Sequence, residues 1–313
     1  MYRKAIFILS AVALLLPSCN QEEDAALPTT GTDAAAQPLS VSTRAGADET
    51  FDSFRLYLHD LATNTETEEH ILAWDGTNGA WLENGRQPVT ALLPAIVNAT
   101  ACDAPDQITF ENVVQDGELH SCTVTCNIPA DQTDADKLEA AGKLMYAFSP
   151  RLDKDGSLSL EFQHACSMLV FTVNNKEVIA AGGKGKLANI KVKANTESRY
   201  TYDYENESNG GWTPVYQDDN SGFDCFCDET DETNKTITAY IGSKEYKAGD
   251  VLMTLNVDGI PRNVPINADL PVEPGKIYTF TLDITPKEIT ASFKLSDDSN
   301  LFGWGSEDEE KEL

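Results

Sequence analysis

Four histidines and seven cysteines are the residues of this chain best suited to bind a metal or to act as nucleophiles. The histidines (His59, His70, His120 and His164) lie in no H-E-x-x-H pattern, so the zinc site of a metalloprotease is not expected. No G-x-S-x-G turn is present to expose a nucleophilic serine. The 51 acidic residues make accidental carboxylate pairs inevitable, and no pair stands out for glycoside hydrolysis. We therefore predict no catalytic residue, no metal and no cofactor, and we expect a protein that is not an enzyme.

The glycine-rich stretch GGKGKL, residues 182–187, superficially resembles a phosphate-binding loop. Lys186 is followed by Leu187, where a serine or threonine would have to bind magnesium, and the required glycine spacing is absent. We interpret this stretch as an ordinary loop. His164 shares a strand face with Leu160 and Phe162, so we expect a buried, hydrogen-bonded histidine and not a catalytic one.

Cys19 differs from the other cysteines because it follows an apolar run directly. Arg3 and Lys4 precede the run AIFILSAVALLL, residues 5–16, which has the length of a signal-peptide core and is too short to span a bilayer. Leu16-Pro17-Ser18-Cys19 resembles the lipobox of bacterial lipoproteins, in which the thiol receives a diacylglycerol and becomes the mature N-terminus. Ordinary secretion with an accidental cysteine is the alternative. We predict a signal peptide over residues 1–18, with Cys19 lipidated (palmitate included) and serving as a membrane tether.

The net charge of −28 bears on the partners of the chain. So strong a negative charge repels nucleic acid and anionic membranes, and no basic stripe offsets it. We therefore expect no nucleic-acid partner. The acidic residues that follow Cys19 resemble the short signal that sends some Gram-negative lipoproteins to the outer face of the outer membrane, although a solvated linker would look the same.

The other six cysteines lack the spacing of a structural zinc site. Free buried thiols or one or two disulfides are both compatible with an exported protein, and the sequence leaves the pairing open. These cysteines are Cys102, Cys122, Cys126, Cys166, Cys225 and Cys227.

Apolar and polar residues alternate along most of the chain, which predicts an all-β fold. Phe54, Leu56 and Leu58 illustrate this period of two, and similar runs recur at short spacing up to residue 284. Asp258-Gly259 predicts a tight hairpin turn, and the apolar run in residues 160–173 predicts a central strand buried on both faces. Only residues 134–148 look helical, with Asp134 as the N-cap and Gly142 weakening the helix.

This pattern leads to a four-part organisation of the chain. Residues 1–18 are the signal peptide, and the Ala-, Thr- and Pro-rich residues 19–46 are a flexible linker or removable N-terminal segment. We predict an N-terminal β-sandwich domain over residues 47–155 and a C-terminal one over residues 156–313.

Three stretches of the chain carry motifs of a known family. In the segment 134–173, an H-A-x-S-x-L-x-F-x-V strand is matched by His164, Ala165, Ser167, Leu169, Phe171 and Val173. The second stretch is PVEPGKIYTFTLDI, residues 271–284, and the third is Trp304 near the C-terminus. In this order they resemble the fimbrillin family of surface lipoproteins, a family of type V pilins. The resemblance implies two tandem transthyretin-like β-sandwich domains and a role in the fimbrium (pilus). It also implies assembly by β-strand addition, with other fimbrial subunits as head-to-tail partners.

In the fimbrillin family, a trypsin-like protease cuts many subunits after an arginine and removes the lipidated N-terminus with its first strand. Arg44 is the only basic residue between Cys19 and Arg55, so it is the candidate cleavage site, with an ordinary linker arginine as the alternative. Leu39 and Val41 alternate with serines, so residues 39–42 could be the removable strand. After Trp304, the chain ends without an apolar alternating run, and only ITASFKL, residues 289–295, could be a C-terminal donor strand.

The resemblance implies adhesion at the cell surface, with the outer membrane as anchor and surface ligands of a host or another bacterium as partners. The sequence does not decide between a stalk, a tip and an anchor subunit. The alternative function is a surface-exposed glycan-binding β-sandwich lipoprotein, for which an exposed coplanar pair among Trp74, Trp81, Trp212 and Trp304 would be evidence.

Overall fold

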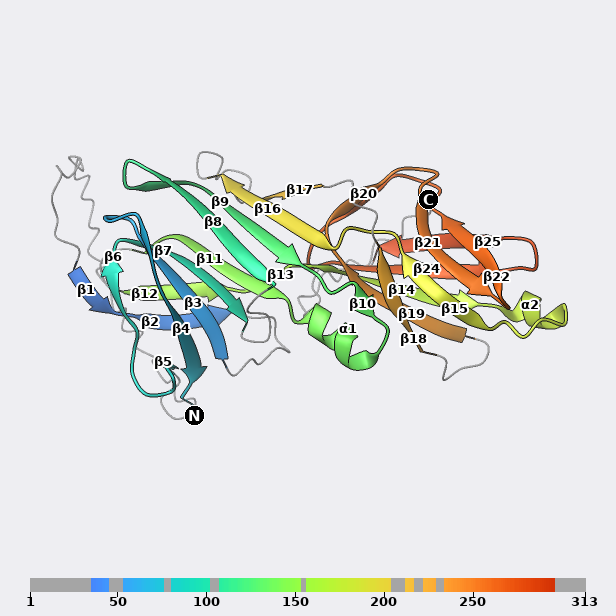
Figure 1. Cartoon of the computed structure of the whole chain (residues 1–313), viewed down its shortest axis with the longest axis horizontal. Coiled ribbons are helices and arrows are strands. Elements are labelled where there is room, and N and C mark those ends of the chain that lie inside the picture. Colours follow the sequence, from blue (N-terminus) through green and yellow to red (C-terminus); the bar gives the residue numbers. More distant parts are fainter. Residues whose placement is uncertain are drawn as a thin grey trace, which may run out of the picture. The chain divides into compact units, whose positions relative to one another are not determined.

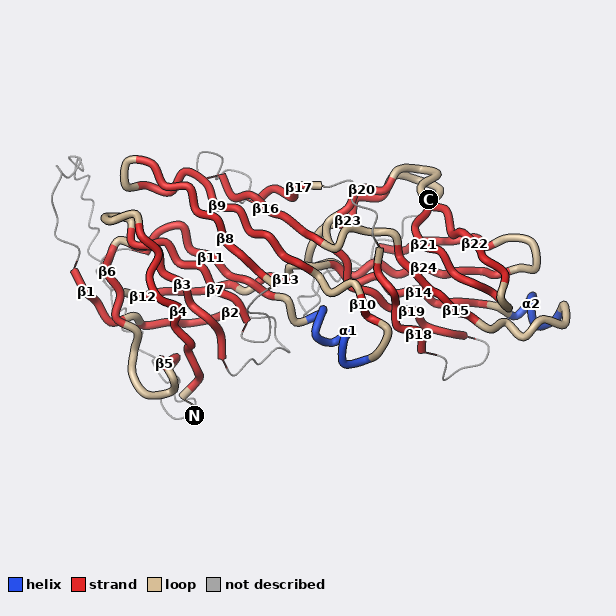
Figure 2. Tube along the Cα trace, in the orientation of Figure 1, coloured by secondary structure: helices blue, strands red, loops and turns tan. Residues whose placement is uncertain are grey.

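The computed structural model confirms the all-β fold. Strands dominate the part of the chain that the structure describes, and its two helices are short (Figures 1 and 2). The structure describes residues 35–44, 53–75, 80–101, 107–152, 156–203, 212–216, 222–228 and 234–295. Within these residues no helix has the length and apolarity needed to cross a membrane. The predicted signal peptide, Cys19, Cys102 and Trp304 lie outside the described residues.

A six-stranded sheet, in the order β13-β11-β7-β3-β4-β5, is formed by strands that precede residue 165. Phe54, Leu56 and Leu58 point to one face of this sheet, as their alternation predicted, and belong to one buried cluster. The opposite face is also covered, so His59 is buried as well. The strands are β3 (Ser53–Asp60), β4 (Thr65–Trp74), β5 (Trp81–Glu83), β7 (Ala95–Ala101), β11 (Met145–Leu152) and β13 (Gln163–His164).

A four-stranded antiparallel sheet, in the order β17-β16-β9-β8, packs on that opposite face. Aromatic rings join the two sheets: Phe110 and Tyr146 lie 6.4 Å apart, and Tyr146 stacks on Tyr200 at 6.1 Å between ring centroids. This pair of sheets is a β-sandwich. Its strands are β8 (Ile108–Gln115), β9 (Glu118–Asn127), β16 (Glu197–Asp203) and β17 (Trp212–Val215).

A nine-stranded sheet holds the two strands that carry the motifs described above. The strand β14 (Ser167–Asn174) lies between β19 and β24 (Ile277–Ile284), as expected for a central strand. Leu169 and Phe171 are fully buried, and Phe171 stacks on Phe280 at 4.8 Å. The order is β22-β21-β15-β18-β19-β14-β24-β25, with β10 (Asp131–Gln132) paired to β18. The other strands are β15 (Leu187–Val192), β18 (Phe223–Asp228), β19 (Asn234–Ile241), β21 (Val251–Val257), β22 (Ile260–Pro265) and β25 (Ile289–Leu295).

Three two-stranded sheets complete the strand pairing of the described residues. They are β1 (Ala35–Pro38) with β6 (Thr90–Leu93), β2 (Ser40–Arg44) with β12 (Ser157–Glu161), and β20 (Lys244–Tyr246) with β23 (Leu270–Val272).

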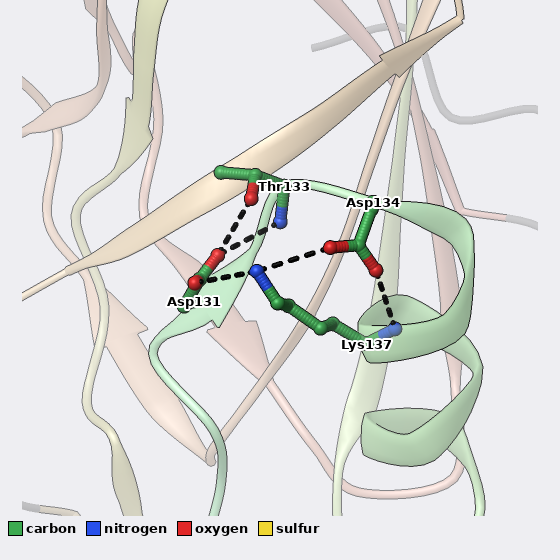
Figure 3. Close-up of polar contacts among 4 residues, drawn as sticks. All are labelled: Asp131, Thr133, Asp134 and Lys137. Carbon is green, nitrogen blue, oxygen red and sulfur yellow. Dashed lines mark hydrogen bonds and ion pairs between the residues drawn. The ribbon is translucent and has the colours of Figure 1, made fainter.

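Helix α1 (Ala135–Gly142) begins where the sequence predicted but ends earlier. Asp134 caps it, accepting a hydrogen bond from the Lys137 backbone N–H at 2.9 Å (Figure 3). The Lys137 ammonium also contacts the carboxylate of Asp131 at 2.7 Å, so the polar side chains before the helix fix its first turn (Figure 3). Residues 145–148, predicted to be helical, begin strand β11 instead, because their backbone pairs with β7 and β13. Helix α2 spans Lys176–Ala180.

The position of Gly142 has a packing reason. A Cβ atom on this residue would lie 2.7 Å from the ring of Tyr240 in β19, so the Tyr240 side chain would have to shift to accommodate any larger residue. The predicted hairpin turn is confirmed, because Asp258 and Gly259 both have positive φ, at 51° and 82°, between β21 and β22.

The predicted division into two domains at residues 155 and 156 stays a prediction. Strand β12, which follows that boundary, pairs with β2 and contributes Leu158 and Leu160 to the same buried cluster as Phe54. The first residues of the predicted second domain therefore pack with the strands that precede them in the chain.

Candidate functional site: the surface covered by the N-terminal strands

Residues 35–44, which we call the N-terminal segment, lie docked as two strands and not as an extended linker (Figure 1). Strand β2 runs parallel to β12, with Val41 opposite Leu158 and Arg44 opposite Glu161. Strand β1 runs antiparallel to β6. Strand β2 lies within the stretch 19–46 that the sequence predicted to be a flexible linker or a removable N-terminal segment, and this division of the chain stays a prediction.

The alternation of β2 explains why it docks. Leu39 and Val41 are 3% and 8% exposed, whereas Ser40 and Ser42 face outward. Backbone hydrogen bonds hold the segment: Leu39 N–H donates to Val89 O at 2.7 Å, and Ser40 N–H donates to Gly156 O at 2.8 Å. The segment therefore has one apolar face turned to the protein and one polar face turned to water.

We call the surface beneath the segment the acceptor surface. It consists of Val89 and Ala91, at and beside β6, and of Leu158, Leu160 and Phe162, at and beside β12. These side chains are at most 6% exposed with the segment in place. Among the described residues, β12 pairs only with β2 and β6 only with β1. Removal of the segment would leave both strands with unpaired backbone groups next to exposed apolar side chains.

The energetic balance of docking is close. Burial of an aliphatic side chain contributes about 1.5–3 kcal/mol, and each backbone hydrogen bond contributes about 0.5–1.5 kcal/mol. Ordering the backbone costs about 1–2 kcal/mol per residue. A segment of this length is therefore held only moderately, and its covalent link to the rest of the chain is an important part of what keeps it in place.

Arg44 is the last residue of β2, so the structure places the candidate cleavage site at the end of the docked segment. A cut after Arg44 would break the chain between β2 and β3. The segment, and with it the part of the chain that precedes it, would then be attached to the rest of the protein by non-covalent contacts alone.

The other residues singled out in the sequence have structural roles. His164 is buried, its Nδ1 lies 3.1 Å from Gly142 O, and burial lowers its pKa to about 3. Cys122, Cys126, Cys166 and Cys225 are free thiols in the interior. Burial raises the pKa of both Cys166 and Cys225 to about 12, which makes them poor nucleophiles and metal ligands.

The glycine-rich loop is confirmed as a structural loop. The carboxylate of Asp258 accepts hydrogen bonds from the backbone N–H groups of Lys184, Gly185 and Lys186, at 2.9, 3.1 and 2.9 Å. These hydrogen bonds, led by the one from Lys186, lower the pKa of Asp258. The amides that a phosphate would need are already occupied. Within the described ranges, no group of three or more histidine, cysteine or acidic residues could hold a metal ion.

The three tryptophans that the structure describes do not form a stacking platform. Trp74 is 48% exposed, but its neighbour Trp81 is buried and the two planes meet at 64°. Trp212 packs edge-on against Tyr146 and Phe148. None of the three described tryptophans therefore offers an exposed coplanar pair.

The comparison with family models tests the family resemblance that the sequence motifs suggested. The model of the fimbrillin-like family matches residues 110–296. The chain belongs to the fimbrillin-like family. This membership supports a fimbrial or adhesive role at the cell surface and interaction with other fimbrial subunits, and it favours a protein without catalytic activity.

Solved structures with similar folds include several fimbrial and adhesion proteins. A fimbrial assembly protein from Parabacteroides distasonis is 14% identical, with 85% of this chain and 98% of that chain covered and a TM-score of 0.45. The tip fimbrial protein Mfa3 from Porphyromonas gingivalis is 14% identical, with 83% and 99% covered and a TM-score of 0.44. A candidate cell adhesion protein from Bacteroides uniformis is 14% identical, with 87% and 99% covered and a TM-score of 0.46. Comparison with curated proteins found no match.

Proposed function

We propose that this fimbrillin-like protein is a lipid-anchored fimbrial subunit that joins its neighbours by β-strand addition at the acceptor surface. The observation that supports this most is the docked N-terminal segment, which buries Leu39 and Val41 and ends at Arg44. A strand from another subunit with the same alternation could form the same backbone pairs with β6 and β12. Because such a contact joins two different surfaces, it extends head to tail into a filament.

Lipidation and cleavage would act in sequence in this proposal. Lipidation of Cys19 would hold the precursor at the outer membrane, on the cell surface. After a cut at Arg44, only the non-covalent contacts of the docked segment would hold the lipidated N-terminus, and loss of the segment would detach that N-terminus and free the acceptor surface together. Release from the membrane and competence for assembly would therefore be coupled through a single peptide bond.

Strand β25 is the candidate donor. It is the edge strand of the nine-stranded sheet and pairs antiparallel with β24 over its whole length. Ile289 is buried, and Ala291 and Phe293 are partly buried against the same core. Donation would therefore require β25 to leave its own sheet. A subunit that keeps β25 in place would accept a strand without giving one, which is the arrangement expected at the end of a fimbrium, as a tip or an anchor, and not in its stalk.

The test is assembly after verified trimming. Purified mature protein is treated with an arginine-specific protease, the new N-terminus at Ala45 is confirmed by mass spectrometry, and the oligomeric state is followed by light scattering. Head-to-tail oligomers are expected after trimming and not before. The Arg44→Gln variant, which keeps the segment and removes the cleavage site, is the matched control and is expected to stay monomeric. Trimmed protein that stays monomeric alone, and also with added fimbrial subunits, would refute strand addition.

Lipid anchoring is tested separately in cells. The Cys19→Ala change is expected to release the protein from the membrane fraction. Treatment with globomycin is expected to prevent maturation of the precursor in the membrane. A Cys19→Ala protein that remains as firmly membrane-held as the natural one would contradict lipidation at Cys19, without bearing on strand addition.

A further inference from the structure

A cavity of about 270 Å³ lies between the two sheets of the sandwich described above, lined by residues of β3, β4, β7 and β8. Its floor includes Asn98 and His59, which are 4% and 7% exposed, together with the buried Ile108. Glu66 and Thr109 also line it and are exposed, so the cavity opens to solvent between them. The acceptor surface involves β2, β6 and β12, and none of these strands lines the cavity.

Four buried polar atoms in the cavity lining have no hydrogen-bond partner among the residues that the structure describes. They are His59 Nδ1, Asn98 Oδ1 and both amide atoms of Asn112, Oδ1 and Nδ2. The other ring nitrogen of His59, Nε2, lies 2.9 Å from Asn64 Oδ1. Since that oxygen can only accept, Nε2 donates, and Nδ1 of the uncharged ring is left as an acceptor. The cavity thus presents three acceptors and one two-proton donor.

So many unpaired polar groups in one place require an explanation. Buried side-chain polar atoms in folded proteins almost always have a partner, and each one without a partner lowers stability. Aliphatic residues at positions 98 and 112 would fit the surrounding core, which elsewhere contains Ile96 and Ile108. Departures from the packing rules of a core are expected where a protein binds something. The unpaired atoms therefore indicate a bound molecule that supplies the missing partners.

The lining residues restrict the chemistry of that molecule. The part of the lining that the structure describes contains no lysine or arginine, and Glu66 stands at the mouth on a protein of net charge −28, so an anion is disfavoured. A hard metal cation prefers several carboxylate or carbonyl oxygens, and Glu66 is the only carboxylate among the described lining residues. The three acceptors and one donor match a neutral molecule whose groups both donate and accept, which is the property of hydroxyl groups.

We propose that this cavity binds one sugar unit, a neutral ring carrying several hydroxyl groups. Its hydroxyls would bond to Asn98, Asn112 and His59, while the aromatic rings of Tyr57 and Phe110 would face its apolar C–H surface. These two rings lie 6.4 Å apart and both line the cavity. The volume of about 270 Å³ lies just below the usual range for small-molecule sites, which is typically about 300–1,000 Å³. A single ring therefore fits, and a longer glycan would enter only by its terminal unit.

The test uses the full mature chain and ligand-observed saturation-transfer NMR. The probes are methyl α-glucoside, methyl α-galactoside, N-acetylglucosamine and myo-inositol, with inorganic phosphate and methylammonium as charged comparators. We expect saturation transfer to at least one neutral probe and none to phosphate. Asn98→Val and Asn112→Val are each expected to weaken binding at least tenfold. Asn263→Val, at an exposed position of β22, is the matched control and is expected to bind as the natural protein does.

The stability of the same variants provides a second measurement, which separates a binding role of Asn98 and Asn112 from a purely structural one. Because Asn98→Val and Asn112→Val each remove unpaired buried polar atoms, we expect the urea midpoint of unfolding to stay the same or rise while sugar binding falls. Phe110→Leu, which keeps an apolar side chain, is expected to weaken binding severalfold and serves as the second variant if a valine variant fails to fold.

Three results would overturn the proposal. One is the absence of saturation transfer to every neutral probe at concentrations of tens of millimolar. Another is binding that none of the lining substitutions changes. The third is binding of the charged comparators in preference to the sugars. A cavity filled only by ordered water would give the first of these results. None of them bears on assembly at the acceptor surface.

Discussion

Weakening the docked N-terminal segment should make Arg44 much easier to cut. Leu39→Ala and Val41→Ala together remove five buried carbon atoms from β2, both residues being less than a tenth exposed. At about 0.8 kcal/mol per carbon, the docked state loses about 4 kcal/mol, which corresponds to a rise of nearly 1,000-fold in the undocked population. A protease binds its substrate as an extended strand, so residues on both sides of Arg44 must be free of β12.

The assay is limited proteolysis with an arginine-specific protease, with cleavage after Arg44 followed by mass spectrometry. When redocking is faster than cleavage, the rate follows the undocked population, so the double variant is expected to be cut at least tens of times faster than the natural protein. Ser40→Ala is the matched control, because that side chain faces outward on the same strand, and it is expected to change the rate less than twofold. Equal rates for the double variant and the natural protein would show that docking of β2 does not protect this bond.

The remaining predictions concern the interior. Gly142→Ala should lower the free energy of unfolding by about 1–3 kcal/mol in urea denaturation despite the better helix propensity of alanine, because its Cβ would meet the ring of Tyr240 at 2.7 Å; an unchanged or higher stability would contradict the close approach. The pKa of His164 is about 3 in the folded protein, against an ordinary value of 6.5, so the unfolded chain binds a proton more readily and this residue's contribution to stability should be lost as pH falls from 6.5 towards 3. His164→Gln should flatten this pH dependence of the unfolding free energy by up to roughly 1.4 kcal/mol per pH unit. Identical pH profiles for the variant and the natural protein would refute the burial of the ring. At pH 8 the thiols of Cys166 and Cys225, each with a pKa of about 12, should react with a maleimide far more slowly in the native protein than in denaturant; rapid native labelling of either would show that it is accessible.

Local signals in the sequence predicted the parts of the fold that depend on neighbouring residues. Asp258-Gly259 favours positive φ at two successive positions, and this requirement holds whatever surrounds the turn. The continuous apolar run around Phe171 predicted a central strand buried on both faces, and β14 is central in its sheet. Only the face that carries Leu169 and Phe171 is buried, whereas Thr172 on the other face is exposed, so that part of the prediction is wrong. Helix α1 was predicted at its start, where Asp134 caps it, but not at its end. Its end is set by the contact with Tyr240, which is distant in sequence.

Features that depend on long-range pairing could not be predicted. The parallel pairing of β2 with β12 joins residues more than 110 positions apart, and the sequence around Leu158 contains no sign of its partner. The alternation of Leu39 and Val41 did identify β2 as a strand, but not the surface that it covers. The sequence did not predict a site at Asn98 and Asn112, because an isolated asparagine on a strand is ordinarily solvent-exposed. Only the stacking of the two sheets brings them together with His59.

The central claim is that residues 35–44 occupy a surface that another strand can take. It is tested most directly by cutting the full mature chain after Arg44, removing the released peptide, and following hydrogen exchange of the backbone amides in residues 157–161 while a synthetic peptide of residues 35–44 is added. We expect these amides of β12 to exchange faster without the segment and to regain protection with the peptide, but not with a peptide in which Leu39 and Val41 are replaced by aspartate. Amides that stay equally protected with the segment removed, or that respond equally to both peptides, would contradict the account.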